Sequence, residues 1–278
     1  MLEPTEKQRS ALAELQGTLA LAQFLVIKDK DAFGDYRSAS KRAVQETGGR
    51  RAHGVRVDQV LAGGEMPYQA ITVDLFPSGE AARSAFEAVR DERQAALADV
   101  YALAVRPRTG PPRIAKALGF LAPLLSRTLG TRSEKELTGF AVLANPETGP
   151  VPETVAVLRE HDQTTPFYVM NLNKYYPMAN YESGEEISGE QAYNRYGTRI
   201  LPYLVSVGGY PAIIGHTEGL FVGDEHCPLH DDWDDFAMVY YPSRLKFVHM
   251  MTNTPRKGVH HRDAGLQRAV LMPSSDWA

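Results

Sequence analysis

The sequence has few of the features that reveal a function directly. Among its 278 residues there is a single cysteine, Cys227, so no disulfide can form within the chain, which fits a reducing compartment. The formal net charge is only −4, so the chain lacks the basic excess that binds nucleic acid. It contains no G-x-S-x-G, phosphate loop, dinucleotide glycine fingerprint or H-E-x-x-H. These absences argue against the common hydrolases, kinases and nicotinamide enzymes.

Long apolar runs are also missing. The first residues lack the basic start and unbroken apolar stretch of a secretory signal. The most apolar segment, 114–130, is interrupted by Lys116, Pro123 and Arg127 and is too short to cross a bilayer. The remaining composition, 43% hydrophobic and 23% charged, is that of a globular protein. We expect a cytoplasmic protein with no membrane span.

An aromatic-Pro-Ser step occurs twice, at 76–78 and at 241–243. Proline cannot donate a hydrogen bond to a sheet, so it ends a strand. Serine is a good N-cap, because its side chain accepts a bond from a free amide in the first helical turn. Each step therefore predicts a strand that passes directly into a helix, and its recurrence indicates an internal repeat.

The surroundings of the two steps repeat as well. A Gly-Gly pair ends a helical segment in each half, at 48–49 and 208–209, where a left-handed C-cap is expected. Apolar segments that read as strands lie at 21–27, 68–76, 102–107, 166–172, 236–241 and 269–273. Each half thus has the order strand, helix, strand, strand, helix, strand, which is the ferredoxin-like unit.

The bare sheet face of one such unit is expected to pack on a second sheet. We therefore predict an α+β fold of two tandem ferredoxin-like βαββαβ domains whose antiparallel sheets pack as an α/β barrel. The first domain, a diverged copy, would span 1–108, and the second would span 165–278. A helical connector, 109–164, would join them, with a basic amphipathic helix at 111–129 that packs at the junction or lies on a membrane.

The second half also resembles a known superfamily. The residues that carry the resemblance are PFYVMNLNKY (166–175), SGEQAYNRYGTRILPYLVSVGGYP (188–211), and DDWDDFAMVYYPSRLKFVHMM with HHRDAGLQRAVLMPS within 231–275. They resemble the dimeric α/β-barrel superfamily and, more closely, a domain family of unknown function within it. The resemblance implies a ferredoxin-like fold with a cleft and brings no established activity. Haem, which some members of the superfamily use, would need an axial histidine that this sequence does not identify.

The two halves differ in length at two places. The second half has a longer link after its first strand, including 175–188, and a longer turn at 223–233. In a ferredoxin-like unit both of these loops, and the end of the second helix at 260–265, lie at one end of the sheet. Long loops at one edge of a rigid sheet commonly build a site. We therefore predict a site at that rim of the second domain.

Histidines at this rim suggest two kinds of chemistry. His226 and His230, in an H-C-x-x-H stretch, are candidate ligands for a transition metal; a polar, acidic hairpin is the alternative. His260 and His261 are candidate catalytic residues. A simple interaction of their helix end with the helix dipole is the alternative.

Polar residues on the first strand and first helix of the second half complete the candidate set. Asn171, Asn173 and Tyr175 alternate along the strand, so they share one face and could act in catalysis. The candidates for substrate binding are Tyr196, Arg199, His216 and Trp233. A tyrosine–arginine helix face could hold a carboxylate or phenolate, but a solvated helix would show the same pattern.

These residues favour a small-molecule enzyme of the dimeric α/β-barrel type. Its acid/base chemistry would be isomerisation, cleavage or cofactor-independent oxidation of a small organic acid or enol. The alternatives are a non-catalytic ligand-binding or assembly module and a metal-assisted enzyme. We expect no cofactor, with a transition metal and then haem as alternatives. The expected partner is a small-molecule ligand, with homodimer formation as a further alternative and no nucleic acid.

Overall fold

The computed structural model describes residues 1–108, 110–129, 148–230, 232–254 and 256–277. Its first half contains the strands β1 (Leu19–Ile27), β2 (Arg50–Val57), β3 (Ala70–Phe76) and β4 (Leu97–Pro107), with the helices α2 (Lys30–Glu46), α3 (Gly79–Glu87) and α4 (Arg90–Ala96). The second half contains β5 (Phe167–Tyr175), β6 (Tyr210–Val222), β7 (Asp235–Tyr241) and β8 (Leu266–Asp276), with α8 (Gly189–Ser206), α9 (Arg244–Asn253) and α10 (Arg256–Gly265).

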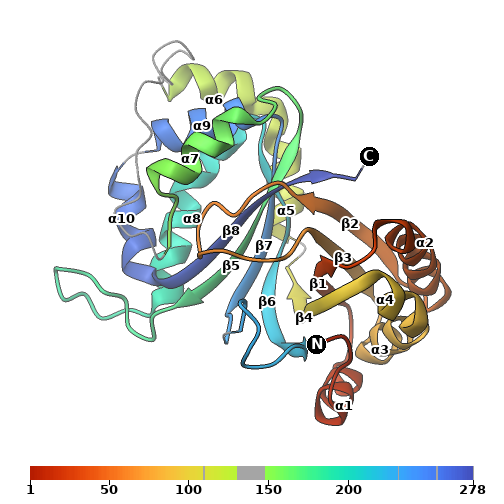
Figure 1. The fold of residues 1–278 in the computed structure, drawn as a ribbon. Helices are drawn as coiled ribbons and strands as arrows, with labels where there is room; N and C mark the ends of the chain where they lie inside the picture. Colours follow the sequence, from red (N-terminus) through yellow and green to blue (C-terminus); the bar gives the residue numbers. More distant parts are fainter. Residues whose placement is uncertain (109, 130–147, 231, 255, 278) are drawn as a thin grey trace.

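The eight strands form one closed antiparallel barrel in the order β1-β3-β2-β8-β5-β7-β6-β4 (Figure 1). Each half contributes four neighbouring strands, and the halves join at two seams. At one seam β2 pairs with β8, with Val55 opposite Asp276. At the other seam β4 pairs with β6, with Val105 opposite Thr217. The predicted fold class is therefore confirmed, and the barrel closes within a single chain.

The aromatic-Pro-Ser steps make the predicted junctions. The Ser78 side chain accepts a hydrogen bond from the amide of Ala81 at the start of α3. The Ser243 side chain accepts one from the amide of Lys246 at the start of α9. In both halves the segment after the step was predicted as one helix and forms two. These are α3 and α4 in the first half, and α9 and α10 in the second. The Gly-Gly pairs also behave as predicted, since the first glycine of each pair has φ of 77° or 80°.

The inside of the barrel is filled with apolar side chains. Among those that are almost fully buried are Phe24, Tyr101, Met170, Phe236 and Met272. The helices cover the outside of the barrel, with α2, α3 and α4 over the first half and α8, α9 and α10 over the second (Figure 1). Since the interior is packed, the space between the sheet and the outer helices is the place in the second half to look for a ligand site.

The segment 111–129 of the connector, predicted as one helix, is broken into shorter pieces. Residues 110–129 form α5 (Gly110–Ala117), a short 3-10 helix (Leu118–Leu121) and α6 (Ala122–Thr128), in which Pro123 lies in the first turn, a position that tolerates proline. α5 packs on β6 and α6 packs on α8. α7 (Pro152–Glu160) follows, and the part of the predicted connector at 130–147 lies outside the described residues. Within the described ranges no helix is both long and apolar enough to cross a membrane.

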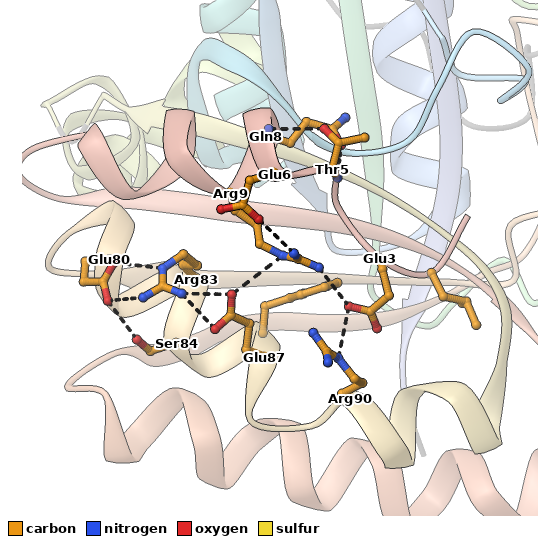
Figure 2. A network of polar contacts seen from close by, with 12 residues as sticks. Glu3, Thr5, Glu6, Gln8, Arg9, Glu80, Arg83, Ser84, Glu87 and Arg90 are labelled. Carbon is orange, nitrogen blue, oxygen red and sulfur yellow. Dashed lines mark hydrogen bonds and ion pairs between the residues drawn. The ribbon is translucent and has the colours of Figure 1, made fainter.

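An N-terminal helix, α1 (Glu6–Glu14), was not predicted from the sequence. It packs on α3, with Leu12 buried. A network of ion pairs surrounds this contact, in which Arg9 lies between Glu3, Glu6 and Glu87 (Figure 2). Solvent-accessible pairs of this kind each contribute about 0–1 kcal/mol, so the buried leucine is the main anchor of α1.

The half-buried histidine of β2, His53, makes stability depend on pH. Burial, and then the charge of Arg50, lowers the pKa of His53 from 6.5 to about 4. The unfolded chain therefore binds a proton between these values that the folded protein does not. We predict that the free energy of unfolding falls by up to ~3 kcal/mol as the pH falls from 6.5 to about 4.

Urea unfolding at neutral pH and near pH 4 measures this loss. His53→Gln should reduce the loss, because glutamine has no proton to gain. His226→Gln, at an exposed position, is the control and should behave as the unchanged protein. An equal acid loss in His53→Gln would contradict the prediction.

The β4–β6 seam has no room for a side chain at Gly215. A Cβ built there would lie 2.3 Å from the carbonyl oxygen of Arg106. We predict that Gly215→Ala lowers the free energy of unfolding by ~1–3 kcal/mol, because two strand backbones would have to separate. In contrast, Gly34→Ala in α2 meets nothing within 4 Å and should stabilise by ~0.5–1 kcal/mol. Chemical denaturation of both variants tests the pair, and equal effects would refute it.

Candidate functional site

A cavity of about 520 Å³ lies between α8 and the outer face of the second-half sheet. Asn171 of β5 and Ala237 and Val239 of β7 line it from the sheet, and Ile200 and Leu204 line it from α8. The sheet residues are only half-buried although a helix covers them, because the space above them is open. This volume is in the usual range for sites that hold small organic ligands.

Local sequence features fix α8 above this cavity. The Ser188 side chain caps the helix by accepting a bond from the Gln191 amide. The next residue, Gly189, packs so closely that a Cβ there would lie 2.3 Å from the carbonyl oxygen of Tyr176. Pro202, within the helix, lacks an amide and cannot make the usual intrahelical bond there. The start of α8 is therefore held at the end of the sheet while its later turns run over the cavity.

A carboxylate, an imidazole and a phenol meet beside the cavity. Asp235 lies opposite His216 on β6 and opposite Asn173 on β5, so all three project from the outer face. The Tyr175 hydroxyl donates a hydrogen bond of 2.6 Å to Asp235 Oδ2. Asp235 Oδ1 lies 2.7 Å from His216 Nδ1, at ion-pair distance but without hydrogen-bond alignment. Proton transfer commonly uses residue types of this kind.

Two further charged residues lie on the other side of His216. Arg108, just after β4, donates to Glu190 Oε1 at 3.2 Å and also contacts the His216 ring. The same Glu190 oxygen lies 3.8 Å from His216 Nε2. The imidazole is therefore positioned between the carboxylates of Asp235 and Glu190.

The environment changes the acidity of this cluster. Burial raises the pKa of Asp235, although the hydrogen bond from Tyr175 and the charges of His216 and Arg108 act against this rise. Burial also raises the pKa of Tyr175, and nearby Tyr193 and Asp235 add to the effect. The phenol therefore stays protonated, and Asp235 is the cluster's carboxyl whose proton affinity is increased. A carboxyl with a raised pKa in a cleft is a candidate general base or acid.

Tyrosine rings extend from this cluster along α8. The Tyr193 ring lies 5.4 Å from Tyr175 and 5.5 Å from Tyr196. The Asn173 amide donates to the Tyr193 hydroxyl at 3.4 Å. Burial raises the pKa of Tyr193, so its hydroxyl keeps a proton that it can donate to a ligand oxygen.

Five of the predicted site residues are brought to this region. Asn171, Asn173 and Tyr196 line the cavity. Tyr175 and His216 belong to the acid–base cluster beside it. Both asparagines project from the face of β5 that the alternation predicted.

The two adjacent histidines lie elsewhere. His261 Nδ1 lies 2.6 Å from the Tyr181 hydroxyl, and the His260 ring packs against the Tyr181 ring at 5.2 Å. Burial and the charges of Arg199, His260 and Arg195 lower the pKa of His261. Neither histidine lines the cavity. The next residue along α10, Arg262, does line it.

The remaining predicted residues do not line the cavity either. Arg199 is exposed on α8. Trp233 is buried inside the barrel, where its indole nitrogen donates to the carbonyl oxygen of Leu229. His226 and His230 are exposed. No group of three histidine, cysteine, aspartate or glutamate residues that could hold a metal ion occurs in the part of the chain that the structure describes.

The two insertions lie at the same end of the sheet but on opposite sides of it. Lys174, at the end of β5, donates to the carbonyl oxygen of Asp232 in the longer turn. That turn sends Cys227 and Leu229 into the barrel interior. The segment after β5 packs outside instead, where Tyr181 contacts α8 and α10 residues. The common rim was predicted correctly, but the two insertions do not border one cavity.

Four residues of the candidate site were not predicted, because their sequence signal is weaker: Asp235, Arg108, Glu190 and Arg262. Asp235 is the last member of the acidic run DDWDD, and only strand register distinguishes it from its neighbours. Counting back along β7 from Tyr241, which precedes the helix, would have placed Asp235 on the outer face. Arg108 belongs to the other half of the chain, so no motif within the second half could indicate it.

No protein-family model matches this chain, and no curated protein matches it. Solved structures do resemble it. A protein of unknown function from Rhodopseudomonas palustris has 29% identity over 46% of this chain and 94% of its own, with a TM-score of 0.41. A mutant chlorite dismutase from Candidatus Nitrospira defluvii has 9% identity over 96% of this chain and 95% of its own, with a TM-score of 0.46.

Burial of the Asp235 carboxylate should reduce stability at neutral pH. Since its pKa is raised in the folded protein, the cost is absent below the ordinary value of 3.8 and complete above the raised value. We predict that Asp235→Asn is more stable than the unchanged protein by ~1 kcal/mol at neutral pH, with the difference vanishing toward pH 3.8. Urea unfolding across this range measures it, with Asp35→Asn at an exposed position as the control. A less stable Asp235→Asn protein at neutral pH would disprove the prediction.

Proposed function

We propose that the protein is a small-molecule enzyme that carries out proton transfer on a small organic acid or enol bound in the cavity under α8. The observation that carries this proposal is the Asp235 carboxyl, whose pKa is raised by burial and which is held by Tyr175 and His216 beside the cavity. A carboxyl whose pKa is raised by burial reduces stability at neutral pH, so its presence beside a cavity of ligand size favours a functional role.

The residues fit the removal of a proton next to a carbonyl group. The Asp235 carboxylate takes the proton from carbon, and the electron pair of that bond moves to the carbonyl oxygen to form an enolate. The Tyr193 hydroxyl and the Asn173 amide, which line the cavity, are the donors available to stabilise that oxygen. Return of the proton to another atom of the substrate completes an isomerisation.

Cleavage or oxidation could begin from the same enolate. Loss of a leaving group from the carbon next to it would give cleavage, and reaction with dioxygen would give oxidation without a cofactor. In each case Asp235 performs the first step, while His216 and Tyr175 hold its position. A metal-assisted reaction at His226 and His230 is the alternative raised by the sequence, although both side chains are exposed.

A non-catalytic ligand-binding module is the main rival. Under that proposal the cavity holds a ligand, and the charged cluster only shapes its mouth. The two proposals differ in what happens to a bound acid, because only an enzyme exchanges its carbon-bound protons with solvent.

Proton exchange in heavy water provides an assay that does not require the natural substrate. Nuclear magnetic resonance of a panel of 2-oxo and 3-oxo acids would report loss of the protons next to the carbonyl. We predict that Asp235→Asn slows exchange of the accepted acid by ~10²–10⁴-fold while leaving its binding intact. Tyr175→Phe should cause a smaller loss, since it removes one hydrogen bond to Asp235.

His261→Gln is the matched control, because His261 is a rim residue outside the cavity. It should leave exchange unchanged. Loss of exchange in His261→Gln but not in Asp235→Asn would favour the assignment made from the sequence. Binding without exchange for every acid of the panel would favour the non-catalytic module.

A further inference from the structure

Arg262 on α10 is a buried cation in the wall of the cavity. Its side chain is only 5% exposed, and it belongs to the residues that line the cavity under α8. Its guanidinium donates to the carbonyl oxygen of Thr148 and to the Thr148 hydroxyl. Both of these partners are neutral, so neither compensates the buried charge.

The carboxylate nearest to Arg262 is a poor partner. Asp263, the next residue, has an oxygen 4.0 Å from the guanidinium, at the limit of an ion pair. Burial raises the pKa of Asp263, against the lowering effect of Arg262 and His260. No carboxylate among the described residues accepts a hydrogen bond from Arg262. A buried charge without a close counter-ion is costly, and an anionic ligand would remove that cost.

Arg262 and Asp235 occupy different parts of the same cavity lining, with Tyr193 in reach of both. Besides the dominant effect of burial, Arg262 lowers the pKa of Tyr193 and Asp235 raises it. The wall of the cavity also contains apolar side chains, which include Ile200, Leu201, Leu204, Val239 and Phe247. The lining thus combines a buried cation, Arg262, with an acid–base cluster and an apolar surface. Its second arginine, Arg108, is part of that cluster and is paired with Glu190.

We propose that the cavity selects monoanionic carboxylates with an apolar body, and that Arg262 binds the carboxylate group. The planar guanidinium matches a carboxylate, with which it forms paired hydrogen bonds. A single buried arginine balances one negative charge, which favours a carboxylate over a dianionic phosphate. This inference deepens the proposed function, because it places the carboxylate at Arg262 and leaves the reacting carbon for Asp235.

A pair of probes of the same shape tests the charge selection. Calorimetry would compare 2-naphthoate with its neutral analogue 2-naphthamide on the full-length protein. We expect naphthoate to bind ~10–100-fold more tightly, the range for a hydrogen bond to a charged group. Arg262→Gln should remove this preference while still binding naphthamide, which shows that the variant is folded. Arg262→Lys should retain part of the preference.

Arg195→Gln is the matched control, because Arg195 is an exposed arginine of α8 that pairs with Glu185. It should keep the full preference. Equal binding of both probes, a preference that survives in Arg262→Gln, or no binding of either probe to the unchanged protein would each overturn the inference.

Asp235→Asn separates this inference from the proposed function. Because it removes a negative charge from the same lining, it should prefer naphthoate at least as strongly as the unchanged protein does. If the preference depends on Arg262 but proton exchange does not depend on Asp235, the carboxylate site stands and the proposed reaction fails. If exchange depends on Asp235 but the preference does not depend on Arg262, the proposed reaction stands and the carboxylate site fails.

Discussion

The closure of the barrel at two seams determines which faces of the sheet can border a cavity. Pairing of β2 with β8 and of β4 with β6 turns the inner faces of both halves toward each other. Apolar side chains fill the interior that results, so it offers no space for a ligand. The outer face of the sheet in each half is covered by that half's own helices. A cavity forms there only if those helices do not pack closely on the sheet.

The two halves differ in this packing. In the first half the space between the sheet and the helices shrinks to a void of about 10 Å³. There, the Tyr36 side chain of α2 is buried, and Arg51 donates two hydrogen bonds to Asp74. In the second half the corresponding space is about 520 Å³. The helices of the first half therefore pack tightly on their sheet, whereas those of the second half leave a cavity above theirs.

Much of the fold followed from local chemistry in the sequence. At 76–78 and 241–243 the proline ends a strand and the serine caps the helix that follows, and both roles could be inferred without knowing the tertiary contacts. The alternation of Asn171, Asn173 and Tyr175 gave the correct face for the same reason. These features depend on a few adjacent residues, so contacts with distant segments change them little.

The site was harder to predict because it depends on contacts between distant segments. His260 and His261 were predicted as catalytic residues from their residue type. On the same helix, however, it is the neighbouring Arg262 that lines the cavity. His226 and His230 have suitable chemistry, but their hairpin directs Cys227 into the barrel interior and leaves the histidines in solvent. Asp235 could be recognised only from the strand register, which places it opposite His216. Residue type indicated the kind of chemistry, and register decided which residues were available for it.

Arg108 reaches His216 and Glu190 from just beyond β4, across the seam between the halves. The acid–base cluster of the second half consequently depends on a side chain from just beyond β4, as well as on the pairing of that strand with β6. Separating the two halves would therefore remove a guanidinium from the candidate site in addition to opening the barrel.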